Sequence, residues 1–179
     1  MTEADLQLIK MNTSHYYVRD DSLSNKIMHN GKIYFDRFKR VSSVLNSSII
    51  RKHLMNEIVV AHSLINNDKL ENIVIDYNGT YTDVFYHKVQ LLLRSEGFLN
   101  FTAYRSKTKS HLHIYVHKGH THLSEARILA RAINVKLSKL MPKQWRIYPC
   151  DEIPLNFNIM VLPYSVYAKE RGAAWSKHM

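Results

Sequence analysis

Residues 110–122 read SHLHIYVHKGHTH, and this stretch determines how we expect the middle of the chain to fold. From His111 to His117, apolar residues alternate with histidines and a tyrosine. This period of two predicts a β-strand with one apolar face and one polar face. Neighbouring side chains on one face lie about 7 Å apart. His111 and His113 could therefore converge on one metal ion or one phosphate.

The composition predicts a soluble globular protein. The chain has 179 residues, of which 45% are hydrophobic and 22% charged, as expected for a single domain spanning residues 1–179. No apolar run approaches the roughly 18 residues of a membrane helix, and the first ten residues do not resemble a signal peptide. A lone cysteine, Cys150, cannot form an internal disulfide. We therefore expect a cytoplasmic protein that does not bind membranes.

Positive charge is concentrated in one part of the chain. The net charge is +10, and the segment from Arg94 to Arg146 contains eleven lysines and arginines but only two acids. Such clustering is typical of a surface that binds a polyanion. A solvated helix flank with basic turns would give the same count. The candidate nucleic-acid contacts are Arg105, Lys107, Lys109, His111, Lys118, Arg127 and Arg131.

Residues 1–69 are expected to form an N-terminal α/β extension that packs on the rest of the protein. Aromatic and β-branched residues predict strands over residues 12–18 and 32–38, with a turn at 29–31. Apolar residues at near-helical spacing predict a helix over residues 42–65.

Residues 70–165 are predicted to form an α+β core. Strands are expected over residues 72–77, 100–105, 111–116 and 145–150, and helices over 80–96 and about 122–141. This succession is the split β-α-β-β-α-β arrangement, also called ferredoxin-like or RRM-like. A fifth strand is expected over residues 158–162, and residues 166–179 as a C-terminal tail. In this arrangement helices cover one face of an antiparallel sheet and leave the other free for a ligand. Asp76 and His113 would lie on adjacent strands of it.

Three motifs in this core resemble the archaeo-eukaryotic primase superfamily, the prim-pol domains. An apolar strand ending in an acid, IVIDYN, spans residues 73–78. A small residue before a histidine follows in KSHLHIYV, residues 109–116, and a hydrophobic–acid pair comes at Cys150–Asp151. The resemblance covers residues 70–164.

The prim-pol resemblance implies phosphoryl transfer assisted by two metal ions. It places magnesium or manganese on Asp76, Asn78 and Asp151, with His113 at a phosphate. The family pattern has a second carboxylate where this chain has Asn78, a neutral ligand that holds a hard cation less strongly. The resemblance therefore implies a domain that binds nucleic acid or nucleotides, with polymerase activity weak or absent.

A second resemblance is to endonucleases and transposases that use a histidine–hydrophobic–histidine motif. His111-Leu112-His113 is similar to that motif. The resemblance implies one divalent metal on His111 and His113, and a tyrosine nucleophile at Tyr164 or Tyr167.

Two further expectations concern side chains around these motifs. Tyr104 and Tyr115 could stack nucleic-acid bases on the open sheet face, or pack in the core. His117, His120 and His122 are expected to be exposed turn residues. A third functional hypothesis remains, a non-catalytic module whose basic face docks an acidic protein.

Overall fold

The computed structural model describes residue 6, residues 9–23 and residues 25–170. These described residues form three α-helices and three antiparallel sheets, so the protein is a mixed α+β structure. None of their helices combines the length and the apolar character needed to cross a membrane.

The largest sheet is built from the middle of the chain. Its elements are β6 (Lys69–Tyr77), α3 (Thr82–Ser95), β7 (Phe101–Arg105), β8 (Leu112–His122), α4 (Leu123–Ser138) and β9 (Trp145–Tyr148). The strand order is β11-β7-β8-β6-β9, where β11 (Ser165–Glu170) comes from residues expected in the tail. The expected strands and helices of residues 70–150 are therefore confirmed, with shifted ends.

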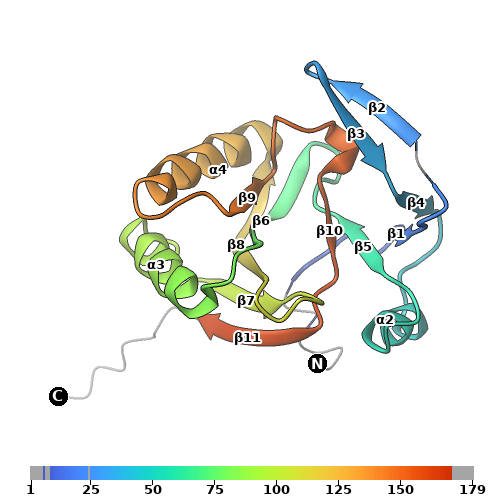
Figure 1. The fold of residues 1–179 in the computed structure, drawn as a ribbon, viewed down its shortest axis with the longest axis horizontal. Helices are drawn as coiled ribbons and strands as arrows, with labels where there is room; N and C mark the ends of the chain where they lie inside the picture. The colour runs from blue at the N-terminus through green and yellow to red at the C-terminus, as the bar shows by residue number, and fades with distance from the viewer. Residues whose placement is uncertain (1–5, 7–8, 24, 171–179) are drawn as a thin grey trace.

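Helices α3 and α4 cover one face of this sheet (Figure 1). The apolar positions of the alternating strands point toward them, as Ile75 on β6 and Ile114 on β8 show. Asp76 and His113 occupy the next positions and lie directly opposite each other on β6 and β8. The predicted placement of these two residues on adjacent strands is confirmed.

A second sheet is built mainly from the N-terminal part of the chain. Its order is β10-β5-β1-β4, from β10 (Ile159–Val161), β5 (Val60–Ser63), β1 (Tyr16–Arg19) and β4 (Phe38–Val41). The strand expected over residues 158–162 thus joins this sheet and does not extend the core sheet.

The prediction of a long helix over residues 42–65 is wrong. Only α2 (Ser47–Leu54) is helical, and Asn56 follows in a left-handed conformation with φ of 62°. A left-handed residue ends a helix. The apolar residues that suggested its continuation, Ile58 and Val59, lead into β5, which is paired on both sides. Sheet pairing here overrides a helical spacing.

The two sheets pack face to face, which leaves no open sheet face for stacking bases. Figure 1 shows α3 and α4, the five-stranded sheet and the four-stranded sheet as successive layers. Tyr104 and Tyr115 of the large sheet are fully buried in a cluster with Leu64 and Met160 from the other side. Their predicted role as exposed stacking platforms is therefore wrong, and the alternative of core packing holds.

A two-stranded hairpin projects beside the second sheet. It consists of β2 (Asn25–His29) and β3 (Lys32–Asp36), joined by the predicted turn. Both turn residues, Asn30 and Gly31, have positive φ, as a tight two-residue hairpin turn requires. The 3₁₀ helix η1 (Leu155–Phe157) follows β9.

Candidate functional site

A cleft of about 630 Å³, here called the central cleft, lies between the large sheet, the second sheet and the hairpin. Asp76, Asn78, His111 and His113 line it together. The structure thus brings the candidate acid, amide and histidines to one place, although the cleft lies between two sheets and not on an open face.

His113 lies at the floor of the cleft beside Asp76. Its Nε2 is 3.6 Å from Oδ1 of Asp76, and its side chain is only 7% exposed. Burial is the largest influence on the pKa of His113 and lowers it, while the Asp76 carboxylate acts in the opposite direction. His113 is therefore neutral at neutral pH. It carries no charge with which to bind a phosphate.

Arg146 on β9 brings a positive charge to the same place. It lies opposite Asp76 in the sheet register, is exposed, and donates a hydrogen bond to the Tyr148 hydroxyl. Burial and the nearby Asp76 charge raise the pKa of Tyr148, which keeps its hydroxyl protonated. Arg146 rather than His113 is thus the cation at the floor of the cleft.

The other cations of the cleft come from loops and the N-terminal strands. Arg19, Arg37 and Lys107 line it, and all three are exposed. Arg19 pairs with Asp21 at 2.7 Å. Within the described part of the chain, Arg37 and Lys107 belong to no ion pair. Arg37, Lys107 and Arg146 can therefore meet an anionic ligand.

Aromatic rings complete the lining. Phe35 of the hairpin is 53% exposed, while Tyr17, Tyr34 and Phe38 are half-buried. Rings beside cations are the usual combination for bases and phosphates of single-stranded nucleic acid.

Two hydroxyl groups of the cleft are held by the backbone. The Tyr34 hydroxyl donates to the carbonyl of Glu152 at 2.6 Å, and Ser106 Oγ donates to that of Thr108 at 3.3 Å. A nucleophile needs a base within hydrogen-bonding reach. These two contacts are to carbonyls, so neither hydroxyl donates to a base that could activate it.

The side chains implied by the prim-pol resemblance do not fit the metal site expected from it. Asn78 turns its amide Nδ2 toward Asp76 Oδ2, 3.3 Å away, so a donor and not an oxygen ligand faces the carboxylate. Asp151 is occupied by two arginines. Among the described residues there is no group of three or more His, Cys, Asp or Glu side chains that could hold a metal ion.

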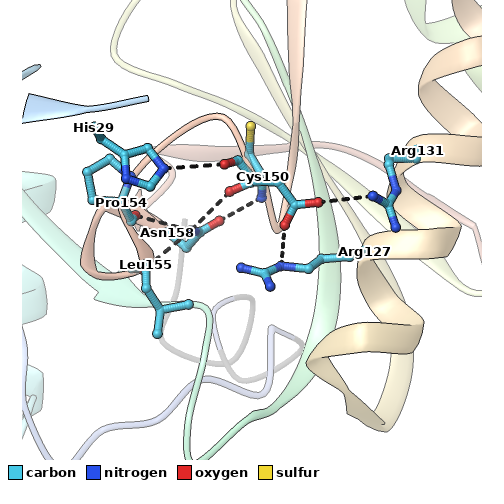
Figure 2. A network of polar contacts seen from close by, with 8 residues as sticks. His29, Arg127, Arg131, Cys150, Pro154, Leu155 and Asn158 are labelled. Carbon is cyan, nitrogen blue, oxygen red and sulfur yellow. Dashed lines mark hydrogen bonds and ion pairs between the residues drawn. The ribbon is translucent and has the colours of Figure 1, made fainter. Parts of the chain in front are cut away.

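Asp151 and the two helical arginines form a structural network. Arg127 Nε lies 2.5 Å from Asp151 Oδ1, and Arg131 Nη1 lies 3.4 Å from Oδ2. Figure 2 shows this pair of contacts beside Asn158, whose side chain bonds the backbone of the same loop. The network ties the loop after β9 to α4, and the Asp151 carboxylate offsets one of the two arginine charges. Neither Arg127 nor Arg131 lines the central cleft.

The remaining predicted basic contacts do not form one surface. Arg105 donates to the carbonyl of Lys109 and lies over the Tyr167 ring at 4.7 Å. Lys109 is exposed next to it. Lys118 is near the far end of β8, about 20 Å from His111 at strand rise, and lies 5.3 Å from the Phe98 ring. Of the predicted set, only Lys107 and His111 line the central cleft.

The two tyrosines proposed as nucleophiles are separated by the sheet. Tyr167 lies on β11, and its hydroxyl donates to Asp83 of α3. Burial, reinforced by Asp83, raises the pKa of Tyr167 to about 12. It thus faces the helices, away from His113. Tyr164 lines the cleft, with its ring 4.3 Å from that of His53, and burial raises its pKa.

His117 is not the exposed turn residue that we expected. Its Nδ1 lies 2.8 Å from Asn72 Oδ1, and its Nε2 lies 3.1 Å from Thr102 Oγ1. Burial lowers the pKa of His117 to about 4. His120 and His122 are exposed as expected, but they lie on β8 and not in a turn. His120 lies 2.9 Å from Glu71.

The N-terminal residues contribute to the site in a way that the sequence pattern did not predict. Tyr34, Phe35 and Arg37 fall in KIYFDRFKR, residues 32–40, where aromatic and basic residues interleave. That interleaving is a signal of nucleic-acid binding. The same residues also have the composition of a strand, which is the only feature predicted for them.

A comparison with protein families concerns this N-terminal part. A protein-family model described as a domain of unknown function (DUF1882) matches residues 1–72. No curated protein matches the chain. The matched segment ends inside β6 and includes the residues that give the cleft Tyr17, Arg19, Phe35 and Arg37.

Proposed function

We propose that this protein binds single-stranded nucleic acid or nucleotides in the central cleft, without polymerase activity. The observation that carries the proposal is the lining of this cleft, where Arg37, Lys107 and Arg146 lie among aromatic rings. Phosphates would contact the three cations and bases would stack on Phe35. The β-α-β-β-α-β succession supports the prim-pol resemblance, while Asn78 beside Asp76 supports the loss of polymerisation.

The nuclease alternative has less support. A covalent phosphotyrosine would need an activated tyrosine next to the histidine pair, and the Tyr167 hydroxyl is instead directed at Asp83. Tyr164 lines the central cleft with the histidines, but within the described residues its hydroxyl has no hydrogen-bond partner that could act as a base. The protonated state implied by a pKa of about 12 also disfavours attack.

Fluorescence anisotropy with labelled single-stranded DNA and RNA tests the proposal, with nucleotides as competitors. We expect the triple variant Arg37→Gln/Lys107→Gln/Arg146→Gln to bind much more weakly across sequences. The salt slope, which is the steepness with which log K decreases against log salt concentration, should fall by about 0.7 for each phosphate that the protein no longer neutralises. Arg51→Gln/Lys52→Gln/Lys139→Gln removes the same charge from exposed positions outside the central cleft and should bind normally. Equal binding by both triple variants, or binding of acidic proteins only, would contradict the proposal.

A further inference from the structure

A second cleft, here called the lateral cleft, opens at the edge of the large sheet. It has a volume of about 590 Å³ and lies between β9, the segment before it and the C-terminal half of α4. Asp76, Asn78 and Arg146 line it as well as the central cleft. The two clefts therefore meet at these three side chains.

The lateral cleft has the chemistry to continue a nucleic-acid site. Lys143 lines it, is exposed, and belongs to no ion pair within the part of the chain that the structure describes. Asn134 and Gln144 add side-chain amides whose oxygens accept from Trp145 Nε1 and the Tyr77 hydroxyl. Their N–H groups are left to donate to acceptors on base edges. The carboxylate of Asp151 at the other side is neutralised by its arginines, so it does not repel a phosphate strongly.

From this contiguity we infer that the two clefts form one track for a single-stranded polynucleotide, so the preferred ligand is a strand and not a mononucleotide. This inference rests on the proposed function. Each cleft has the volume of a pocket for one small ligand. Cations follow one another along the path, with Lys107 in the central cleft, Arg146 at the junction and Lys143 in the lateral cleft. A nucleic-acid backbone carries one charge per nucleotide, and such spaced cations follow it.

The experiment compares oligothymidylates of different length. Fluorescein-labelled dinucleotide and a strand of about ten nucleotides, within the usual range of single-strand sites, are titrated by anisotropy. Thymidine monophosphate serves as a competitor. We expect the longer strand to bind several-fold more tightly. Lys143→Gln should weaken the longer strand several-fold, lower its salt slope by about 0.7, and leave the dinucleotide unchanged. Arg37→Gln should weaken both.

The control is Lys139→Gln, which removes the same charge from an exposed position four residues away that lines neither cleft. A second readout is the NMR signals of the Asn134 and Gln144 side-chain amides, which should shift with the long strand but not with thymidine monophosphate. Equal affinity for both lengths, or equal binding by Lys143→Gln and Lys139→Gln, would contradict the inference that the lateral cleft binds the strand. Neither result would contradict the proposed function. Failure of every probe to bind overturns both.

Discussion

Asp76 and Asn78 share the end of β6 where the two clefts meet, and the difference between their side chains decides what can bind there. The Asn78 amide donates toward the Asp76 carboxylate and satisfies part of its negative charge. A second carboxylate at that position would instead present an additional oxygen ligand to a cation. The side chain at position 78 therefore decides whether this end of β6 offers a cation one carboxylate or two.

The variant Asn78→Asp tests this role. We expect it to bind manganese roughly tenfold more tightly than the natural protein, because ligand charge raises affinity for hard cations. Isothermal titration calorimetry measures the difference. The double variant Asp76→Asn/Asn78→Asp keeps a single carboxylate and should show no gain. If the single variant also shows none, the two side chains do not act on one ligand.

At the scale of elements, the β2–β3 hairpin contributes Tyr34 and Phe35 to the central cleft. This hairpin is a sheet of only two strands. An isolated two-stranded hairpin is marginally stable. Its turn depends on Gly31, whose φ is +72° and whose missing Cβ would meet no atom within 4 Å. A substitution there strains the backbone without causing a clash.

Gly31→Ala should therefore weaken oligonucleotide binding with little change in the melting temperature. The strain of about 1–2 kcal/mol falls on the hairpin and not on the core. Gly97→Ala is a matched control, since Gly97 has φ of +79° and equally open surroundings at the end of α3, outside both clefts. Anisotropy and thermal unfolding of the two variants give the comparison. Equal reductions in binding would show that the hairpin has no special part.

The elements also show which features can be read from a sequence. Alternation in β6 and β8 predicts both strands, their apolar faces and the meeting of Asp76 with His113, because a period of two fixes the face of each residue. The prediction of a helix over residues 42–65 fails because the spacing of Ile58 and Val59 fits a helix as well as the residues that precede a strand. The local sequence pattern does not indicate that β5 pairs with β1 and β10.

At the scale of the whole molecule, the site depends on packing between distant parts of the chain. Arg37 and Arg146 line one cleft although they are over a hundred residues apart. The distribution of charge along the chain points to residues 94–146, whereas Arg19 and Arg37 come from outside that segment. Composition alone also does not show that Arg127 and Arg131 both pair with Asp151, since that depends on how the loop after β9 folds back onto α4.

Buried neutral histidines connect the packed layers of the protein. His62 on β5 places Nδ1 3.2 Å from the carbonyl of Ser63, which can only accept, so Nδ1 carries the proton. Nε2 then accepts the hydroxyl of Tyr115 on β8 at 3.1 Å, across the two sheets. His53 makes a similar connection, donating from Nε2 to the carbonyl of Leu162 and accepting at Nδ1 from the Val60 amide. The two accepting contacts, at Nε2 of His62 and Nδ1 of His53, require the neutral imidazole.

These histidines predict that the protein loses stability in mild acid. Burial lowers the pKa of His62 to about 4, against about 6.5 in the unfolded chain. Between these values the unfolded state binds more protons than the folded state. The free energy of unfolding is therefore highest above about pH 6.5 and decreases as the pH falls toward 4. The loss from His62 alone is about 1.4 kcal/mol per pH unit, and His117 acts in the same direction.

Urea unfolding between pH 4 and 7 measures this dependence. We expect His62→Gln to flatten the pH profile, because glutamine cannot gain a proton, even if it lowers stability at pH 7. His122→Gln changes an exposed histidine in the same way and should keep the natural slope. If the slope of His62→Gln equals that of the natural protein, the bond between His62 and Tyr115 does not couple the packing of the two sheets to pH.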